Sequence, residues 1–173
     1  MPEGHTLRRL ALDLTDTFAG RQVAVSSPQG RFADEAALLH GSVLEGADST
    51  GKHLFLDFGD DRFVHIHLGL IGGLQIVTSE ILDLPVGQVR LRLATPTAEG
   101  GWSYADLRGA TQCALIGVAR RNEVVAGLGP DPLRPDADPE RAWKRISRSE
   151  RSIGDLLMDQ SVIAGVGNVY RAE

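Results

Sequence analysis

The sequence of 173 residues is short of cysteine and of long apolar runs, and each shortage excludes a class of protein. With one cysteine, Cys113, these residues cannot form an internal disulfide or a cysteine-rich zinc site, so we expect Cys113 to be a small buried hydrophobe. The longest apolar stretch, residues 68–77, is broken by glycines and a glutamine and falls short of the ~20 residues that cross a bilayer. The acidic N-terminus differs from that of a signal peptide. We therefore expect a cytoplasmic protein without a membrane partner.

Positive charge is also scarce. Lys and Arg number 18 against 23 Asp and Glu, a formal net charge of -5. Because Lys and Arg supply much of the affinity for phosphates, any interpretation as a nucleic-acid-binding protein must explain this acidity. The apolar fraction of 42% and the charged fraction of 24% are ordinary for a globular protein. At roughly 150 residues per domain, the length predicts one full domain and part of a second.

The first 110 residues predict a β-sandwich that begins with a helix. Apolar residues at helical spacing predict an amphipathic helix from Glu3 to near Gly20, and they are Leu7, Leu10, Ala11, Leu14 and Phe18. Alternating or apolar segments predict short strands at residues 21–27, 53–58, 62–68, 89–94 and 102–107. Residues 33–40 predict a short helix. Several short strands with few helices favour a sandwich.

The composition changes near residue 128. Residues 128–140 carry four of the eight prolines, which predicts a linker at 128–138 between a domain at 1–127 and a helical region at 139–173. Pro139 suits a first helical position, and Asn168 begins another helix. Since isolated helices under ~12 residues are marginal, we expect the sequence to be a fragment that ends inside a helical domain.

The N-terminal pair Pro2 and Glu3 could carry covalent chemistry. Removal of Met1 would expose a secondary amine, and an α-amino pKa of about 7.7 to 8.0 leaves part of it neutral and nucleophilic. Attack on a sugar C1′ would give an iminium ion, and Glu3 could move protons beside it. Proline and acid are also common at helix N-termini, so a structural role stays open. Lys52, between Gly51 and a predicted strand, is by itself typical of a solvated strand end.

Two neighbouring segments offer binding residues. His65 and His67 share one face of a strand, a spacing that could suit a metal, but without a nearby third ligand a hydrogen-bonding or phosphate-contacting role is favoured. Leu70 and Ile71 lie among three glycines in residues 68–73, as a tight turn with exposed apolar tips would need. A bend that faces the core is the alternative.

Two further polar residues are candidates for DNA contact. Arg108 follows a predicted strand and is either a surface arginine or a residue that inserts into a groove. Asn168 stands at a helix start, where free N–H groups favour a phosphate. A plain N-cap at Asn168 is the competing interpretation.

Six motifs together resemble the formamidopyrimidine-DNA glycosylase and endonuclease VIII family. They are "MPEGHTLRRLA", "GKHLF", "HLGLIG", "DLRG", "LGPDPL" and "LLMDQSVIAGVGNVYRAE". The resemblance runs over the whole chain and is most specific at its two ends. It implies an α+β fold, with an N-terminal β-sandwich flanked by helices and the start of a helix-two-turns-helix domain. The zinc finger of the family would lie beyond residue 173, so we expect no metal or other cofactor in this chain.

The resemblance also assigns roles around a damaged nucleotide. It implies that Pro2 attacks C1′ and that Glu3 handles protons at the sugar. Lys52 matches the lysine associated with β-elimination and a phosphate contact. His67 and Asn168 match phosphate contacts that hold the extruded nucleotide.

A gap left in the base stack must be filled, and the resemblance assigns this to Leu70, Ile71 and Arg108. The sequence also departs from many members of the family. Thr6 stands where many have a second glutamate, and residues 109–111 lack the aromatic wedge of members that favour oxidised purines. The missing wedge favours the endonuclease VIII branch and oxidised pyrimidines.

The expected partner is double-stranded DNA with oxidised bases or abasic sites, bound by a monomeric, nucleoid-associated, bacterial-type protein. The acidity is explained if the basic surface that binds DNA in this family is shared with residues beyond this chain. Five cations could form the part of that surface that lies on this chain, namely Arg141, Lys144, Arg145, Arg148 and Arg151. The expected activity is that of a bifunctional DNA glycosylase and AP lyase. A non-catalytic module that binds damaged DNA and an inactive fragment are the alternatives.

Overall fold

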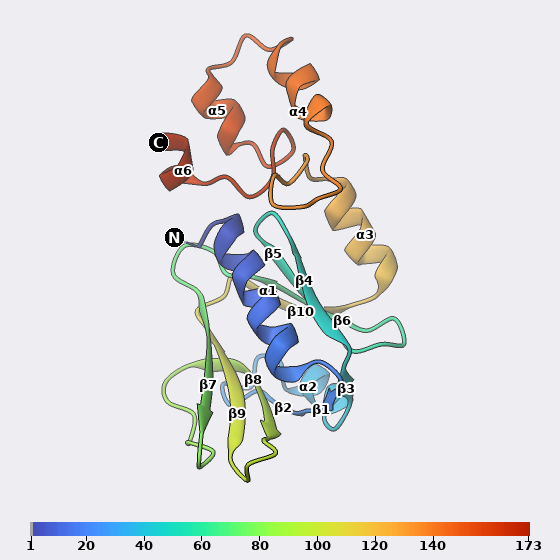
Figure 1. Cartoon of the computed structure of the whole chain (residues 1–173), viewed down its shortest axis with the longest axis vertical. Coiled ribbons are helices and arrows are strands. Elements are labelled where there is room, and N and C mark those ends of the chain that lie inside the picture. The colour runs from blue at the N-terminus through green and yellow to red at the C-terminus, as the bar shows by residue number, and fades with distance from the viewer. Residues whose placement is uncertain (1) are drawn as a thin grey trace.

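The computed structural model describes residues 2–173 and shows an antiparallel β-sandwich with a helical region at one end (Figure 1). The two four-stranded sheets have the orders β10-β6-β5-β4 and β2-β8-β9-β7. Their strands are β2 (Ala24–Ser26), β4 (Gly46–Thr50), β5 (His53–Asp57), β6 (Phe63–His67), β7 (Gly73–Ser79), β8 (Val89–Pro96), β9 (Trp102–Arg108) and β10 (Gln112–Ile116). A short pair, β1 (Arg21–Gln22) and β3 (Val43–Leu44), lies beside them. The predicted α+β fold and sandwich are confirmed.

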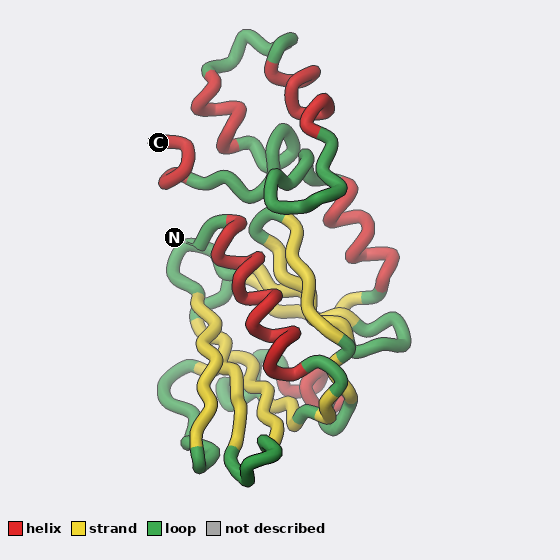
Figure 2. The backbone as a smooth tube through the Cα atoms, viewed as in Figure 1, coloured by secondary structure: helices red, strands yellow, loops and turns green. Residues whose placement is uncertain are grey.

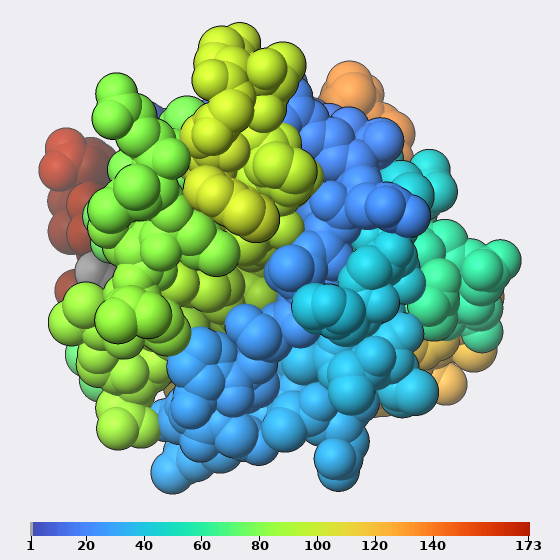
Figure 3. Space-filling model, turned by 90° about the horizontal axis from the view of Figure 1, so that it is seen from below, coloured from blue at the N-terminus to red at the C-terminus, as the bar shows by residue number. Residues whose placement is uncertain are grey.

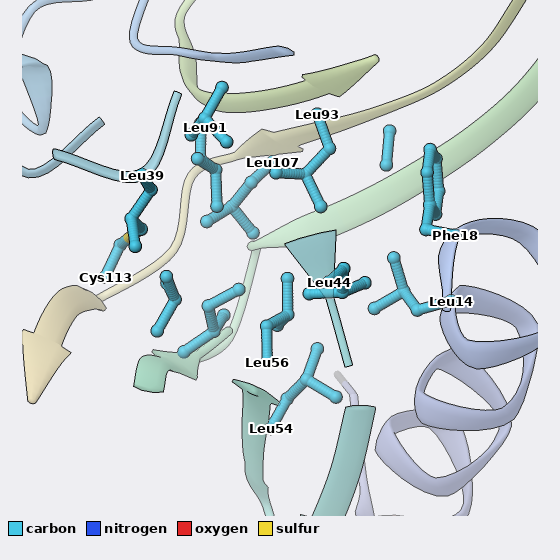
Figure 4. Close-up of a cluster of buried hydrophobic side chains, with 14 of the residues drawn as sticks. Leu14, Phe18, Leu39, Leu44, Leu54, Leu56, Leu91, Leu93, Leu107 and Cys113 are labelled. Carbon is cyan, nitrogen blue, oxygen red and sulfur yellow. The ribbon is translucent and has the colours of Figure 1, made fainter. Parts of the chain in front are cut away.

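Helix α1 (Gly4–Phe18) packs against β4 and β5 and closes one side of the sandwich. Its apolar face is buried as predicted, with Leu7, Leu14 and Phe18 fully enclosed and Leu10 partly exposed. Figure 4 shows side chains from α1, β5, β8 and β9 meeting between the sheets. Cys113 lies in this core, as predicted, and its burial raises the pKa of the thiol to about 12.

Several strands differ from the sequence-based expectation. The predicted strand at 21–27 is two strands, because β1 pairs with β3 while β2 pairs with β8. β4, β7 and β10 were not predicted, although the hairpin of β5 and β6 is confirmed. Arg92 of β8 is buried, and two of its guanidinium nitrogens donate to Asp106 at 2.6 and 2.7 Å.

The remaining helices lie outside the sandwich, and Figure 2 shows no strand in the upper part of the described chain. They are α2 (Ala33–Leu39), α3 (Val118–Ala126), α4 (Pro139–Ile146), α5 (Ile153–Met158) and α6 (Asn168–Ala172). Pro139 takes the first position of α4, as predicted, and the Asp138 carboxylate accepts the N–H of Glu140 at 3.0 Å. α3 was missed by the sequence analysis. α6 returns to the N-terminal end of α1 (Figure 1).

Residues 128–138 have no helix or strand, yet they are firmly packed. Arg134 donates to the carboxylate of Asp48 at 2.8 Å and to the carbonyl of Ser49 at 3.2 Å. Asp48 also pairs with Arg8 at 3.1 Å and with Arg121 at 3.6 Å. One carboxylate on β4 therefore gathers arginines from α1, from α3 and from the segment that leads to the helical region.

Figure 3 views the molecule from the end of the sandwich that lies away from the helical region. Side chains of β7 to β9, in green and yellow, cover one part of this face, and those of α1 and the following segments, in blue, cover another. Within residues 2–173, no helix is both long and apolar enough to cross a membrane.

Candidate active site

An open pocket of about 310 Å³ lies where the N-terminus of the chain meets the sandwich and the helical region. Four residues singled out from the sequence line it: Pro2, Lys52, His67 and Leu70. Met158 and Gln160, from the end of α5 and the turn after it, complete the lining together with Leu7, Leu68, Gly69 and Thr111. Segments from the start, the middle and the end of the chain thus meet in one pocket of a size suited to a small ligand.

Glu3 fastens the N-terminus to the helical region. Its side chain is fully buried, and its carboxylate accepts backbone N–H groups of Gly167 at 3.0 Å, Val169 at 2.7 Å and Tyr170 at 3.4 Å. These donors stand at the beginning of α6, so Glu3 acts as an N-cap supplied from the other end of the chain.

Glycines allow this close approach. The Gly4 N–H donates to the Gly165 carbonyl at 2.8 Å, and a Cβ on Gly4 would lie 2.8 Å from the Cα of Gly165. A Cβ on Gly167 would lie 2.5 Å from the Glu3 carboxyl carbon. Side chains at either position would push the two segments apart. The hydrogen bonds of Glu3 and Gly4 to residues 165–170 therefore hold the N-terminus in place.

The environment shifts the pKa of Glu3 downward. Burial by itself would raise this pKa, but the three backbone donors and the charge of Lys52 outweigh burial. Glu3 is therefore an ionised carboxylate at neutral pH. Burial lowers the pKa of Lys52, although the charge of Glu3 opposes the shift. A lowered pKa makes a neutral, reactive amine more accessible.

Lys52 is positioned by a residue that the sequence analysis did not single out. Asp131 is buried, and its carboxylate accepts the N–H of Gly51 at 2.7 Å and that of Leu133 at 2.9 Å. The residue before Lys52 is thus tied to the "LGPDPL" segment. The motif was recognised, but only the fold shows which group its carboxylate binds.

His67 is oriented by two loops. Its Nδ1 accepts the N–H of Gly69 at 3.2 Å and lies 3.1 Å from the Thr111 hydroxyl, which itself lies 3.0 Å from the His67 carbonyl. Burial and the charge of Lys52 lower the pKa of His67, so its imidazole is neutral at pH 7. His65 is buried and hydrogen-bonded, as favoured from the sequence, and lies 2.8 Å from His53, which was not singled out.

The β6–β7 loop exposes its apolar tip. Leu70 is 71% exposed and Ile71 is 89% exposed, which excludes the alternative of a bend that faces the core. Arg108 lies at the end of β9, directly opposite Gly73. Its guanidinium donates to Asp106 at 2.8 Å and to the Val86 carbonyl at 3.0 Å, so this arginine lies against the protein.

Asn168 begins α6 but does not cap it. Gly167 is the N-cap, and the capping acceptor is the Glu3 carboxylate, so the interpretation of Asn168 as a plain N-cap is wrong. The Asn168 side chain is exposed, and its carbonyl accepts from Arg171 at 2.6 Å. This places Asn168 at the surface next to the Glu3 anchor.

Three of the five cations between residues 141 and 151 have partners within the protein. Arg141 donates to the Leu128 carbonyl at 3.3 Å, Arg145 donates to Ser161, and Arg151 binds Asp159 at 2.8 Å. Across residues 2–173, no three His, Cys, Asp or Glu side chains are grouped as a metal site would require. His65 and His67 therefore have no third ligand among the described residues.

Comparisons with known proteins agree with this architecture. The family model of the formamidopyrimidine-DNA glycosylase N-terminal domain matches residues 1–113, and the model of the formamidopyrimidine-DNA glycosylase H2TH domain matches residues 128–173. The crystal structure of Lactococcus lactis formamidopyrimidine DNA glycosylase bound non-covalently to DNA with an AP site has a TM-score of 0.71 at 27% identity, over 98% of this chain and 64% of that chain. A structure of MutM with DNA that contains carbocyclic 8-oxo-G has a TM-score of 0.77 over 98% of this chain and 66% of that chain, and at 22% identity it shows the fold alone.

Curated relatives are bacterial. The chain is 55% identical over 176 residues to "Endonuclease 8 1" of Mycobacterium tuberculosis, covering 100% of this chain and 64% of that protein. It is 32% identical over 180 residues to "Probable endonuclease 8 2" of Streptomyces coelicolor, covering 100% of this chain and 62% of that protein. The chain thus spans less than two thirds of the length of these relatives. By sequence and by fold it belongs to the formamidopyrimidine-DNA glycosylase and endonuclease VIII family.

Proposed function

We propose that this chain is the catalytic N-terminal part of a bifunctional DNA glycosylase and AP lyase that acts on oxidised bases in duplex DNA. The observation that carries the proposal is the pocket shared by Pro2, Lys52, His67 and Leu70. A nucleophile, a second amine, a hydrogen-bonding histidine and an apolar tip at one opening are the parts that base excision needs.

The chemistry assigned to Pro2 starts with removal of Met1, which lies outside the described residues. The Pro2 nitrogen then attacks C1′ of the damaged nucleotide, and the base leaves with the electron pair of its glycosidic bond. Loss of the proton on the nitrogen and opening of the sugar give an iminium ion. Loss of a C2′ proton to a base then expels the 3′ phosphate, which is the β-elimination step. A fixed amine is required, because attack depends on near-contact geometry.

Glu3 and Lys52 support these steps in different ways. An ionised Glu3 next to Pro2 suits the stabilisation of the cationic iminium and the acceptance of a proton at the sugar. Lys52, which lines the same pocket, suits a phosphate contact and the elimination step. His67 and Asn168 are proposed to hold phosphates, and Leu70 and Ile71 to fill the space of the extruded nucleotide. Arg108 joins them only if its guanidinium leaves Asp106 and the Val86 carbonyl when DNA binds. The small side chains of residues 109–111 favour oxidised pyrimidines as substrates.

Borohydride trapping tests the proposal. The protein is incubated with a duplex that contains an abasic site, reduced, digested, and its cross-linked peptide is identified by mass spectrometry. We expect the adduct on the peptide that begins with Pro2, and no adduct when Met1 is retained. An adduct on Lys52 instead would refute the role of Pro2, and this must be checked because both amines line the pocket.

Strand nicking separates the enzyme from a non-catalytic module. Nicking of the abasic duplex that is lost in Lys52→Ala and in Glu3→Gln supports the enzyme. DNA binding without nicking, under conditions in which the protein is folded, would favour the module that only recognises damage.

A further inference from the structure

A row of histidines lies on the outer face of the sheet β10-β6-β5-β4 beside the pocket. His53 is directly opposite His67 in the β5–β6 pair, and Phe55 is directly opposite His65. The neighbouring pair Leu54 and Ile66 faces the core, so the histidines lie on the opposite face of the sheet. On that face His65 is buried, whereas His53 and His67 are half-buried. The His53 ring lies 5.1 Å from the rings of both His65 and His67, measured between centroids.

The proton of each ring is assigned by its neighbours. The His67 Nδ1 accepts a backbone N–H from Gly69, and because a backbone N–H only donates, the proton of the neutral ring must be on Nε2. The amide nitrogen of Gln112 lies 3.0 Å from the His65 Nδ1 and donates to it, so the proton of His65 is on Nε2. The His65 Nε2 lies 2.8 Å from the His53 Nδ1 and donates its proton to it. His53 is left with its proton on Nε2.

Both outer histidines therefore present an N–H group. Among residues 2–173, the Nε2 atoms of His53 and His67 have no hydrogen-bond acceptor. Both atoms are accessible to solvent, because neither is among the buried polar atoms that lack a partner. Each residue is half-buried rather than enclosed. Burial and the neighbouring histidines lower the pKa of His53 to about 4, and the pKa of His67 is also lowered, so both donors are uncharged at neutral pH.

We propose that His53 is a DNA-contacting residue whose Nε2–H, together with that of His67, donates to one phosphodiester group of the bound strand. The inference rests on the proposed function, because it assumes that DNA occupies the pocket next to Lys52. His65 and Gln112 are positioning residues, since they hold His53 in the tautomer that donates outward.

Binding to a duplex with a tetrahydrofuran abasic analogue tests the inference. A hydrogen bond to a charged group corresponds to a loss of about tenfold in affinity, so we expect His53→Ala to raise Kd about tenfold. His53→Gln, whose amide N–H reaches the place of Nε2–H, should recover most of the loss. His40→Ala, on an exposed histidine after α2, is the matched control and should leave Kd unchanged.

Salt dependence distinguishes an uncharged donor from a cation. Loss of one cation contact lowers the slope of log K against log salt by about 0.9 on duplex DNA. His53→Ala should leave this slope unchanged, whereas Lys52→Ala should lower it. An equal slope change in both variants would overturn the assignment of an uncharged donor.

Methylphosphonate substitutions along the damaged strand locate the contact. When the methylphosphonate stands at the contacted position, the His53→Ala and His67→Ala variants should bind the duplex as tightly as the parent protein does. The substitution has already removed the phosphate oxygen that the two histidines bind in the parent protein. A strand with no such position overturns the inference. Long-range proton–nitrogen NMR correlations give an independent readout, and they should show His53, His65 and His67 all protonated at Nε2. Gln112→Leu should disturb this pattern at His65 and His53 but not at His67.

The outcomes separate the inference from the proposed function. If the parent protein binds the duplex and His53→Ala binds equally well, the inference alone fails. If the longer protein to which the proposal assigns this chain shows no DNA binding while folded, the proposed function fails and the inference with it. Unfolding curves of each variant identify any effect that comes from lost stability.

Discussion

Replacing Glu3 by glutamine tests whether one carboxylate holds the two ends of the chain together. In the structure, Oε1 accepts the N–H of Val169, while Oε2 accepts those of Gly167 and Tyr170. Glutamine has one acceptor oxygen and one amide group that donates. At least one of these N–H groups must therefore lose its partner in Glu3→Gln.

The magnitude follows from the burial of the donors. A hydrogen bond to a charged group is worth about 1.5 to 3 kcal/mol. Gly167 is buried, but Val169 is 55% exposed and Tyr170 is 52% exposed, so water can replace part of what those two lose. We expect a loss of about 2 kcal/mol at this contact, which is a fall of about 30-fold in protection against hydrogen exchange.

Hydrogen exchange followed by NMR is the suitable assay, because it resolves the amides of Gly167, Val169 and Tyr170 individually. All three should exchange faster in Glu3→Gln at pH 7, while Glu150→Gln, on an exposed glutamate of the helical region, should leave them unchanged. Unchanged protection in Glu3→Gln would refute the capping argument.

The acid dependence of the same contact has a defined sign. Because the pKa of Glu3 is lowered by folding, the bound carboxylate stabilises the contact fully above the ordinary carboxyl pKa of about 4.3. That stabilisation is lost as the pH falls through the lower pKa of the folded state. Glu3→Gln should remove this part of the acid dependence.

Two further predictions concern the arginines around Asp48 and the histidine row. Asp48→Asn removes the acceptor shared by three arginines that are one quarter to one third exposed, so we expect unfolding in urea to become easier by about 1 kcal/mol, with a smaller difference at high salt. In an NMR titration, His53 and His65 should stay neutral until near pH 4, where burial and neighbouring charges place their pKa values. The unfolded chain takes up these protons near pH 6.5, whereas the folded protein takes them up only near pH 4. The free energy of unfolding should therefore decrease as the pH is lowered from about 6.5 to about 4.

Matched variants check both arguments. Asp13→Asn breaks a surface pair with Arg9 at 3.5 Å and should change stability by less than about 0.5 kcal/mol. A change as large as that of Asp48→Asn would contradict the special position of Asp48. Ordinary histidine titration of His53 near pH 6.5 would contradict its buried, hydrogen-bonded environment.

Much of the sandwich could be predicted because its signals are local. The apolar spacing of α1 and the alternation on either side of residues 59–61 depend only on nearby residues, and both the helix and the hairpin are confirmed. The hairpin register also places His53 opposite His67. Pairing residues at equal distances on either side of the turn could therefore have predicted the histidine row from the sequence. β4, β7 and β10 lack such a signal, and their pairing depends on neighbours distant in sequence.

The sequence by itself determined the family, the first helix, the β5–β6 hairpin and a set of candidate residues, because motifs and periodicity are properties of short segments. It did not determine what those residues bind. The contact of Glu3 with Gly167 joins residues 164 positions apart, and that of Asp131 with Gly51 joins residues 80 apart. Only the tertiary structure brings such groups together, and their burial and hydrogen bonds then shift the pKa values of Glu3 and Lys52 and set the tautomer of His67.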